Sequence, residues 1–155
     1  MANRRSIGVV LFDGFELLDV FGPLEMFGMK PEVFELCLVA EQKGAVASGQ
    51  GPKALAEHDF GEGRRYDILF VPGGSGTRRE VGNSALLGWL RRQAESAEYV
   101  TSVCTGSALL ARAGILDGVR ATTNKKAFSW ATSQGEAVKW QNEARWVEDG
   151  EGRGS

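Results

Sequence analysis

The sequence has little of the chemistry that marks a metal site or a disulfide scaffold. Its 155 residues include one histidine and two cysteines, and neither a CxxC nor an HExxH pattern occurs. Because zinc sites draw mainly on several Cys and His ligands, no metal site is expected. The two cysteines, Cys37 and Cys104, lie far apart on different expected elements, so no disulfide framework is expected and a reducing cytoplasm is the simplest location.

Long apolar runs and an excess of positive charge are also missing. No segment is long and apolar enough to span a membrane, and no signal peptide precedes the first expected strand. The 18 Lys and Arg residues are offset by 20 Asp and Glu residues, which gives a net charge of −2, and the basic residues are scattered. We therefore expect neither a nucleic acid nor a membrane as a partner.

What the sequence does contain is an alternation of short apolar segments and helical patterns. The apolar segments, typical of buried parallel strands, are 6–12, 33–40, 66–71 and 99–103. The expected helices are 17–29 with an interruption at Gly22-Pro23, 84–97, 108–113 and 125–134, and further short strands are expected at 44–48, 121–122 and 144–147. This alternation predicts an α/β fold with a doubly wound, mostly parallel sheet and helices on both faces.

The length suits one domain, which we place at residues 1–147. The last segment, 148–155, is polar and rich in glycine, and it is expected to be a disordered tail. Ligands of doubly wound sheets bind beyond the carboxyl ends of the strands. Three loops fall there, at 13–19, 72–76 and 104–105, so they are expected to converge on one pocket.

Cys104 lies where a strand gives way to a helix, between the small residues Ser102, Gly106 and Ser107. The free N–H groups and the positive dipole of a helix start stabilise a thiolate, the nucleophilic form of cysteine. A sharp turn at this point would direct the sulfur into a cleft, as in the nucleophile elbow of hydrolases. The alternative is a buried, inert cysteine, because free cysteine is among the most buried residue types.

Asp19 is the candidate acid/base, since it lies in the otherwise apolar stretch 17–23. Desolvation there would raise the pKa of its carboxyl toward neutrality, which suits proton exchange. The alternative is a helix N-cap, which aspartate favours. Glu16, one helical turn earlier, is a competitor for the same role.

Gly73 and Gly74 follow a buried strand and are candidates for presenting backbone N–H groups to an oxyanion or substrate. A simple tight turn is the alternative. Thr105 could supply an N–H and a hydroxyl next to Cys104, or it could only cap the helix.

The remaining residues with catalytic side chains fit structural roles. Cys37 lies within an apolar strand and is expected in the core. His58 lies in a polar loop, and a Cys–His pair through it is poorly motivated. The tryptophans expected to serve packing are Trp130, Trp140 and Trp146.

Five segments carry a resemblance to the ThiJ/PfpI superfamily, relatives of the class I glutamine amidotransferases. They are 7–14 (IGVVLFDG), 18–27 (LDVFGPLEMF), 67–74 (DILFVPGG), 102–107 (SVCTGS) and 113–124 (AGILDGVRATTN). The resemblance implies a flavodoxin-like fold and a homodimer. The combination of 18–23 with 102–107 resembles two branches: isonitrile hydratase, and the sensor half of AraC-type regulators.

In the hydratase branch, the residues matching Cys104 and Asp19 are nucleophile and acid/base, and the residue matching Thr105 positions substrate or water. The resemblance thus implies a cysteine-dependent hydro-lyase that converts a small isonitrile to an N-substituted formamide without a cofactor. A non-catalytic ligand or redox sensor and a glyoxalase or deglycase acting on methylglyoxal are the alternatives. Peptidase-like and deglycase-like branches carry glutamate in place of Asp19 and often histidine in place of Asn124, which argues against a protease.

Family members usually continue beyond a segment like 146–150, whereas this sequence stops at Ser155. We therefore expect a shortened domain with an apolar sheet face that needs a partner or a second copy to cover it. The regulators carry a DNA-binding helix-turn-helix domain after the sensor, and we expect none here because the sequence ends too early for one.

Overall fold

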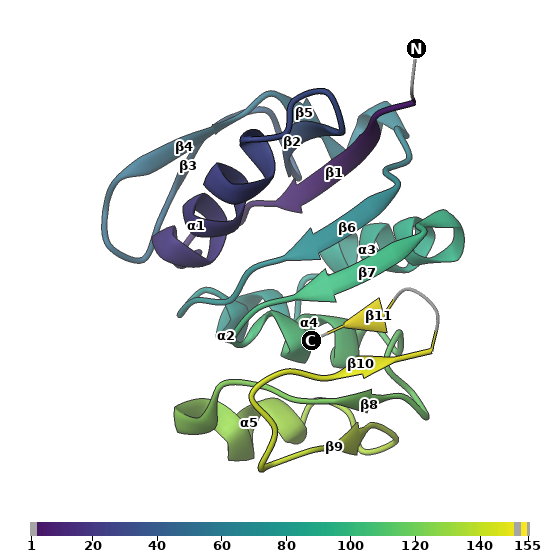
Figure 1. The fold of residues 1–155 in the computed structure, drawn as a ribbon. Coiled ribbons are helices and arrows are strands. Elements are labelled where there is room, and N and C mark those ends of the chain that lie inside the picture. Colours follow the sequence, from purple (N-terminus) through teal and green to yellow (C-terminus); the bar gives the residue numbers. More distant parts are fainter. Residues whose placement is uncertain (1–2, 151–152, 155) are drawn as a thin grey trace.

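A computed structural model describes residues 3–150 and 153–154, and its centre is a seven-stranded sheet (Figure 1). The strand order is β10-β11-β7-β6-β1-β2-β5. The strands are β1 (Arg5–Val10), β2 (Phe34–Ala40), β5 (His58–Asp59), β6 (Ile68–Val71), β7 (Tyr99–Ser102), β10 (Glu148–Asp149) and β11 (Arg153–Gly154). All neighbours pair in parallel except β10 and β11, which are antiparallel.

Helices lie on both faces of this sheet, with α1 on one face and α3 and α4 on the other (Figure 1). The helices are α1 (Leu17–Gly28), α2 (Thr77–Glu80), α3 (Ser84–Ser96), α4 (Gly106–Arg112) and α5 (Phe128–Thr132), with 3-10 turns η1 (Phe60–Glu62) and η2 (Lys125–Ala127). Two small ribbons stand apart from the sheet: β3 (Gly44–Ala47) with β4 (Lys53–Ala56), and β8 (Arg120–Ala121) with β9 (Lys139–Trp140). The expected α/β class with a mostly parallel, doubly covered sheet is confirmed.

Strand β1 lies inside the sheet, and every residue in it after Arg5 is buried. Ile7, Val9 and Val10 are at most 1% exposed, and β1 pairs with β2 on one side and β6 on the other. A strand that is covered on both faces reads as a continuous apolar run, which is why the sequence pattern identified it.

Helix α1 runs without a break through Gly22 and Pro23, so the expected interruption there is wrong. Proline removes one backbone N–H and hence the bond to the carbonyl four residues earlier. The helix is held together by its inner face, where Val20 is fully buried and Leu17, Leu24 and Phe27 pack against the core. Tertiary packing of this face outweighs the local preference of proline.

The segment after residue 120 differs most from expectation. The helix expected at 125–134 consists of the 3-10 turn η2 followed by the short helix α5. No strand forms at 144–147, because the Thr122 hydroxyl bonds the carbonyls of Gln141 and Ala144 at 2.8 and 3.2 Å and takes the place of a strand ladder. The expected disordered tail contributes β10 and β11, while residues 151–152 and 155 lie outside the described part.

Two further features bear on the expectations about a membrane and about an uncovered apolar face of the sheet. None of the helices in residues 3–150 has the length and apolar character to cross a bilayer. On the α1 side of β6 and β7 lies an apolar hollow of about 380 Å³ whose walls include Ile68, Phe70 and Tyr99.

We predict that Leu69→Ala destabilises the fold far more than Leu55→Ala. Leu69 lies in β6 and is fully buried, whereas Leu55 in β4 is 58% exposed. Emptying a packed site loses apolar burial and leaves a cavity, which costs roughly 2–5 kcal/mol. Urea unfolding followed by circular dichroism measures both variants; equal losses would contradict this view of the core.

Candidate active site

Cys104 forms a strained elbow between β7 and α4. Its φ is 55°, and among the described residues it is the only non-glycine residue in the left-handed region. Residues other than glycine adopt this region only at an energetic cost, and strained residues of this kind are common at functional sites. The turn closes with Gly106 N–H donating to the Val103 carbonyl at 3.0 Å. The sharp turn expected at this cysteine is therefore confirmed.

The loop after β6 joins the Cys104 elbow to α1. Gly73 N–H donates to the Asp19 Oδ2 at 3.0 Å, and Gly74 N–H donates to the Thr105 Oγ1 at 3.1 Å. A Cβ on Gly73 would lie 2.6 Å from the Thr105 nitrogen and 2.8 Å from the Cys104 Cβ, so only glycine allows this approach. The three loops expected to converge do converge.

Asp19 lies in the first turn of α1, and the N-cap position is taken by Glu16. The alternative reading of Asp19 as the N-cap is therefore wrong. Burial raises the pKa of the Asp19 carboxyl above its usual value; the Gly73 N–H opposes this and the Glu16 charge adds to it. The expected direction is confirmed. The competitor Glu16 directs its carboxylate to Gln50, whose Nε2 donates to Oε1 at 3.0 Å.

Gly73, Gly74 and Thr105 all lie at the site, but their polar groups are engaged with one another. Both glycine N–H groups already have acceptors, Asp19 and Thr105. Donation of these N–H groups to an oxyanion stays a prediction, and it would require the bonds to Asp19 and Thr105 to break. Thr105 makes no capping bond with its side chain, contrary to the capping alternative. Its hydroxyl instead lies 3.1 Å from that of Thr77, which donates to it.

The Cys104 sulfur accepts a hydrogen bond from the Asn124 Nδ2 at 3.1 Å. Burial raises the pKa of the thiol and outweighs the Asn124 bond, which lowers it; the Asp19 charge raises it further, and the backbone and hydroxyl of Thr105 lower it. The lowered thiol pKa expected from the helix start is therefore wrong. Helix α4 has only seven residues, and the sulfur lies partly out of water beside a carboxyl group.

Asn124, noted in the sequence only as the position where related branches often carry histidine, was not among the expected site residues. Its Oδ1 accepts the Lys126 N–H at 2.8 Å, which fixes the amide so that the NH₂ group faces the sulfur. Thr123 assists by donating to the Cys104 carbonyl at 3.1 Å. The available signal was the polar run 122–124 after a short strand, the same kind of position that singled out the other loops.

The sulfur lies beside a hollow of about 420 Å³. The lining residues are Ser102, Val103, Cys104, Thr122, Thr123, Asn124, Lys125, Arg145 and Trp146. Trp146 is 70% exposed, so its expected packing role is wrong. The Trp130 ring packs under the Arg78 guanidinium, whose central carbon lies 4.1 Å from the ring centre. Trp140 donates from its Nε1 to the Gly135 carbonyl at 2.9 Å.

His58 and Cys37 stand apart from this site. His58 belongs to β5 at the far edge of the sheet, four strands from β7 and hence roughly 19 Å away at about 4.8 Å per strand. It contacts Glu62 at 3.0 Å and forms no pair with Cys104. Cys37 is 3% exposed within β2, as expected. In the described part of the chain, no group of three His, Cys, Asp or Glu side chains could hold a metal ion.

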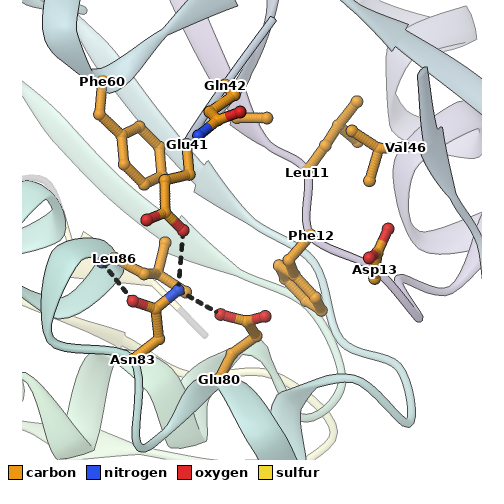
Figure 2. A pocket seen from close by; sticks show the side chains of 11 residues that line it. Leu11, Phe12, Asp13, Glu41, Gln42, Val46, Phe60, Glu80, Asn83 and Leu86 are labelled. Atoms are coloured by element: carbon orange, nitrogen blue, oxygen red, sulfur yellow. Dashed lines mark hydrogen bonds between the residues drawn. The ribbon is translucent and has the colours of Figure 1, made fainter. Parts of the chain in front are cut away.

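A second hollow, of about 280 Å³, lies at the carboxyl ends of β1 and β2 (Figure 2). Asn83 extends its Nδ2 toward Glu41 and Glu80, at 3.2 and 2.8 Å, while its Oδ1 caps α3. Phe12 and Phe60 form apolar walls around these groups (Figure 2). Three polar side chains of this hollow, Glu41, Glu80 and Asn83, are thus joined by hydrogen bonds, and Cys104 is not among the lining residues.

Residues 5–152 match the DJ-1/PfpI family, and the chain belongs to this family. It is 38% identical over 119 residues to isonitrile hydratase from Pseudomonas putida, a match that covers 77% of this chain and 52% of that protein. It is 30% identical over 121 residues to the transcriptional regulator GbdR of Pseudomonas aeruginosa, covering 75% of this chain and 33% of the regulator.

The fold is shared with a solved ThiJ/PfpI family protein from Pseudomonas syringae. The TM-score is 0.83 at 30% identity, and the match covers 98% of this chain and 62% of that one. The chain thus spans about half of the hydratase and somewhat under two thirds of the solved structure. These comparisons confirm the expected superfamily and its flavodoxin-like architecture.

We predict that Asp19→Asn stabilises the protein near neutral pH. Because the folded-state pKa of Asp19 is raised, the folded state binds this proton more tightly than the unfolded state. Stability therefore falls as pH rises through the raised pKa, and the variant escapes that loss. The advantage, measured by urea unfolding, should shrink as pH falls toward the ordinary value of 3.8. The control Asp117→Asn changes an exposed aspartate; a similar pH dependence there would contradict the argument.

We predict that Asn124→Asp and Asn124→Ala both raise the pKa of the Cys104 thiol. Each removes the donor to the sulfur, and Asp keeps the acceptor for Lys126 N–H while adding a negative charge. The pH profile of Cys104 alkylation by iodoacetamide should move to higher pH, further for Asp than for Ala. Asn83→Ala, which removes the N-cap of α3, is the control and should leave the profile in place.

Proposed function

We propose that this protein is a Cys104-dependent hydratase that converts small isonitriles to N-substituted formamides. The proposal rests on two groups that share one site. They are the Cys104 sulfur, on a strained elbow, and the Asp19 carboxyl, whose pKa is raised by burial. One residue, Gly73, links them by donating its N–H to Asp19 and packing against the Cys104 Cβ. The 38% identity to an isonitrile hydratase supports the assignment.

The first half of the reaction adds the thiol across the terminal carbon of the isonitrile. The Cys104 thiolate attacks that carbon and forms a C–S bond, while Asp19 delivers a proton to the same carbon. The product is a thioimidate that retains the C=N double bond. Since ionised Asp19 raises the thiol pKa, a protonated Asp19 both favours the thiolate and holds the proton the carbon needs.

The second half hydrolyses the thioimidate. Asp19, now ionised, takes a proton from water as the oxygen attacks the former isonitrile carbon, and passes this proton to the nitrogen. The tetrahedral adduct then breaks its C–S bond while its hydroxyl proton returns to Asp19, which releases the formamide and restores the Cys104 thiolate and protonated Asp19. Water is the only co-substrate, and its two hydrogens and one oxygen all appear in the product.

A second candidate function is a ligand or redox sensor without turnover. The match to the regulator GbdR favours it. In that case Cys104 would oxidise to a sulfinic acid while no substrate is converted. Lactate formation from methylglyoxal would instead indicate a glyoxalase.

The homodimer implied by the resemblance stays a prediction. A surface suited to it is the outer side of α1, where Leu18 and Met26 are 75% and 73% exposed and Met29, just after the helix, is 76% exposed. Apolar side chains at this spacing on one side of a helix are usually covered in an assembly. Sedimentation velocity reports the oligomeric state.

We predict that formamide production from an aryl isonitrile vanishes in Cys104→Ala and falls about 10²- to 10⁴-fold in Asp19→Asn. The first variant lacks the sulfur that forms the intermediate, and the second lacks the proton donor. Cys37→Ala is the matched control, because it removes the other, buried thiol without touching the site.

Formation of formamide can be followed by liquid chromatography with native circular dichroism as a check of folding. Turnover that survives in Cys104→Ala would rule out the covalent route. A folded wild type without turnover on isonitriles would favour the sensor.

A further inference from the structure

We propose that the hollow above Cys104 takes an electrophile carrying an anionic group, a carboxylate in particular, which Lys125 and Arg145 bind while Trp146 packs against its apolar part. The inference deepens the proposed function, because it concerns the substrate that the same sulfur attacks. It rests on the charge and the unused hydrogen-bonding groups of the lining residues.

The lining carries two cations and no carboxylate. This stands against the chain as a whole, which has more acidic than basic residues. Two acidic residues of the surroundings lie outside the lining: Asp19 acts on the sulfur from α1, and Glu148 borders the neighbouring apolar hollow. An anion in the hollow therefore meets net attraction from its walls.

The Lys125 ammonium group is held in place and keeps N–H donors that a ligand could use. Its Nζ donates to the Thr122 Oγ1 at 2.9 Å and lies 5.5 Å from the centre of the Phe128 ring. An ammonium group has three N–H donors, and this arrangement uses one of them in a hydrogen bond. Thr122 also lines the hollow, so the charge is fixed at its wall.

Arg145 and Trp146 are exposed side chains at the same rim. Within the described residues, Arg145 has no ion pair or hydrogen bond from its side chain, so its guanidinium is available for the two parallel bonds that a carboxylate accepts. Trp146 offers an aromatic face that is 70% exposed, which suits the apolar body of a small ligand.

The hollow is also of a suitable size. At about 420 Å³ it falls within the range of small-molecule pockets. A carboxylate on the cations and a reactive carbon at Cys104 define a compact bifunctional molecule, such as an isonitrile with a carboxyl group elsewhere on its skeleton.

The test compares alkylation of Cys104 by iodoacetate, an anion, with alkylation by iodoacetamide, its neutral counterpart. In both reactions the thiolate forms an S–C bond and iodide leaves, so the ratio of the two rates cancels any change in thiol pKa. The uncharged N-acetylcysteine amide gives the reference ratio, and mass spectrometry assigns the label to Cys104 rather than Cys37. This readout does not depend on turnover.

We expect the iodoacetate to iodoacetamide ratio of the protein to exceed the reference several-fold. Arg145→Gln and Lys125→Gln should each lower it about two- to five-fold, as expected for loss of one partly exposed ion pair, and high salt should lower it as well. Lys126→Gln and Arg112→Gln, which remove exposed charges outside the lining, are the controls and should leave it unchanged. A ratio equal to the reference, or one insensitive to Arg145 and Lys125, would overturn the inference.

The second part of the test compares the turnover of two isonitriles. For 4-isocyanobenzoate, kcat/KM should exceed that for phenyl isonitrile, and Arg145→Gln should reduce the first without changing the second. If neither isonitrile reacts while the alkylation ratio behaves as expected, the hydratase proposal fails and the anion site stands. If both react equally and the ratio matches the reference, the anion site fails and the hydratase stands.

Discussion

The contact on which the rest of the site depends is the close approach of the Gly73 backbone to the Cys104 elbow. This approach brings two adjacent strands, β6 and β7, to a common edge and leaves no room for a side chain at residue 73. The Gly73 N–H then reaches Asp19 across the same gap, so one residue contacts both Asp19 and the Cys104 elbow. The parallel sheet supplies the register and the glycine supplies the space.

The electrostatics of the site follow from this crowding. Because Asp19 and Cys104 are both partly withdrawn from water, each favours its neutral form, and the charge on one opposes the charge on the other. Asn124 and Thr105 offer neutral donors to the sulfur rather than a positive partner. Ionisation of either group is therefore opposed by burial and by the charge of the other.

The sequence was informative where function coincides with regular structure. Apolar runs marked the central strands, and the residues directly after them, Gly73, Cys104 and Thr105, were found because turns at strand ends are readable from small residues. Asn124, Arg145 and Trp146 were not found, because they come from a segment whose course is set by side-chain bonds from Thr122 rather than by periodicity. The sign of the thiol shift was missed for a related reason: helix starts are visible in a sequence, whereas burial depends on packing.

The positive φ of Cys104 has a consequence for how the protein distributes its stability. A left-handed backbone costs a non-glycine residue about 1–2 kcal/mol, and no local preference of the segment offsets it. The surrounding sheet and helix must therefore hold the elbow against its own tendency to relax. The position of this sulfur is thus a property that the whole framework confers, and a mutation far from the pocket that loosens β6 or β7 would let the elbow relax and move the sulfur.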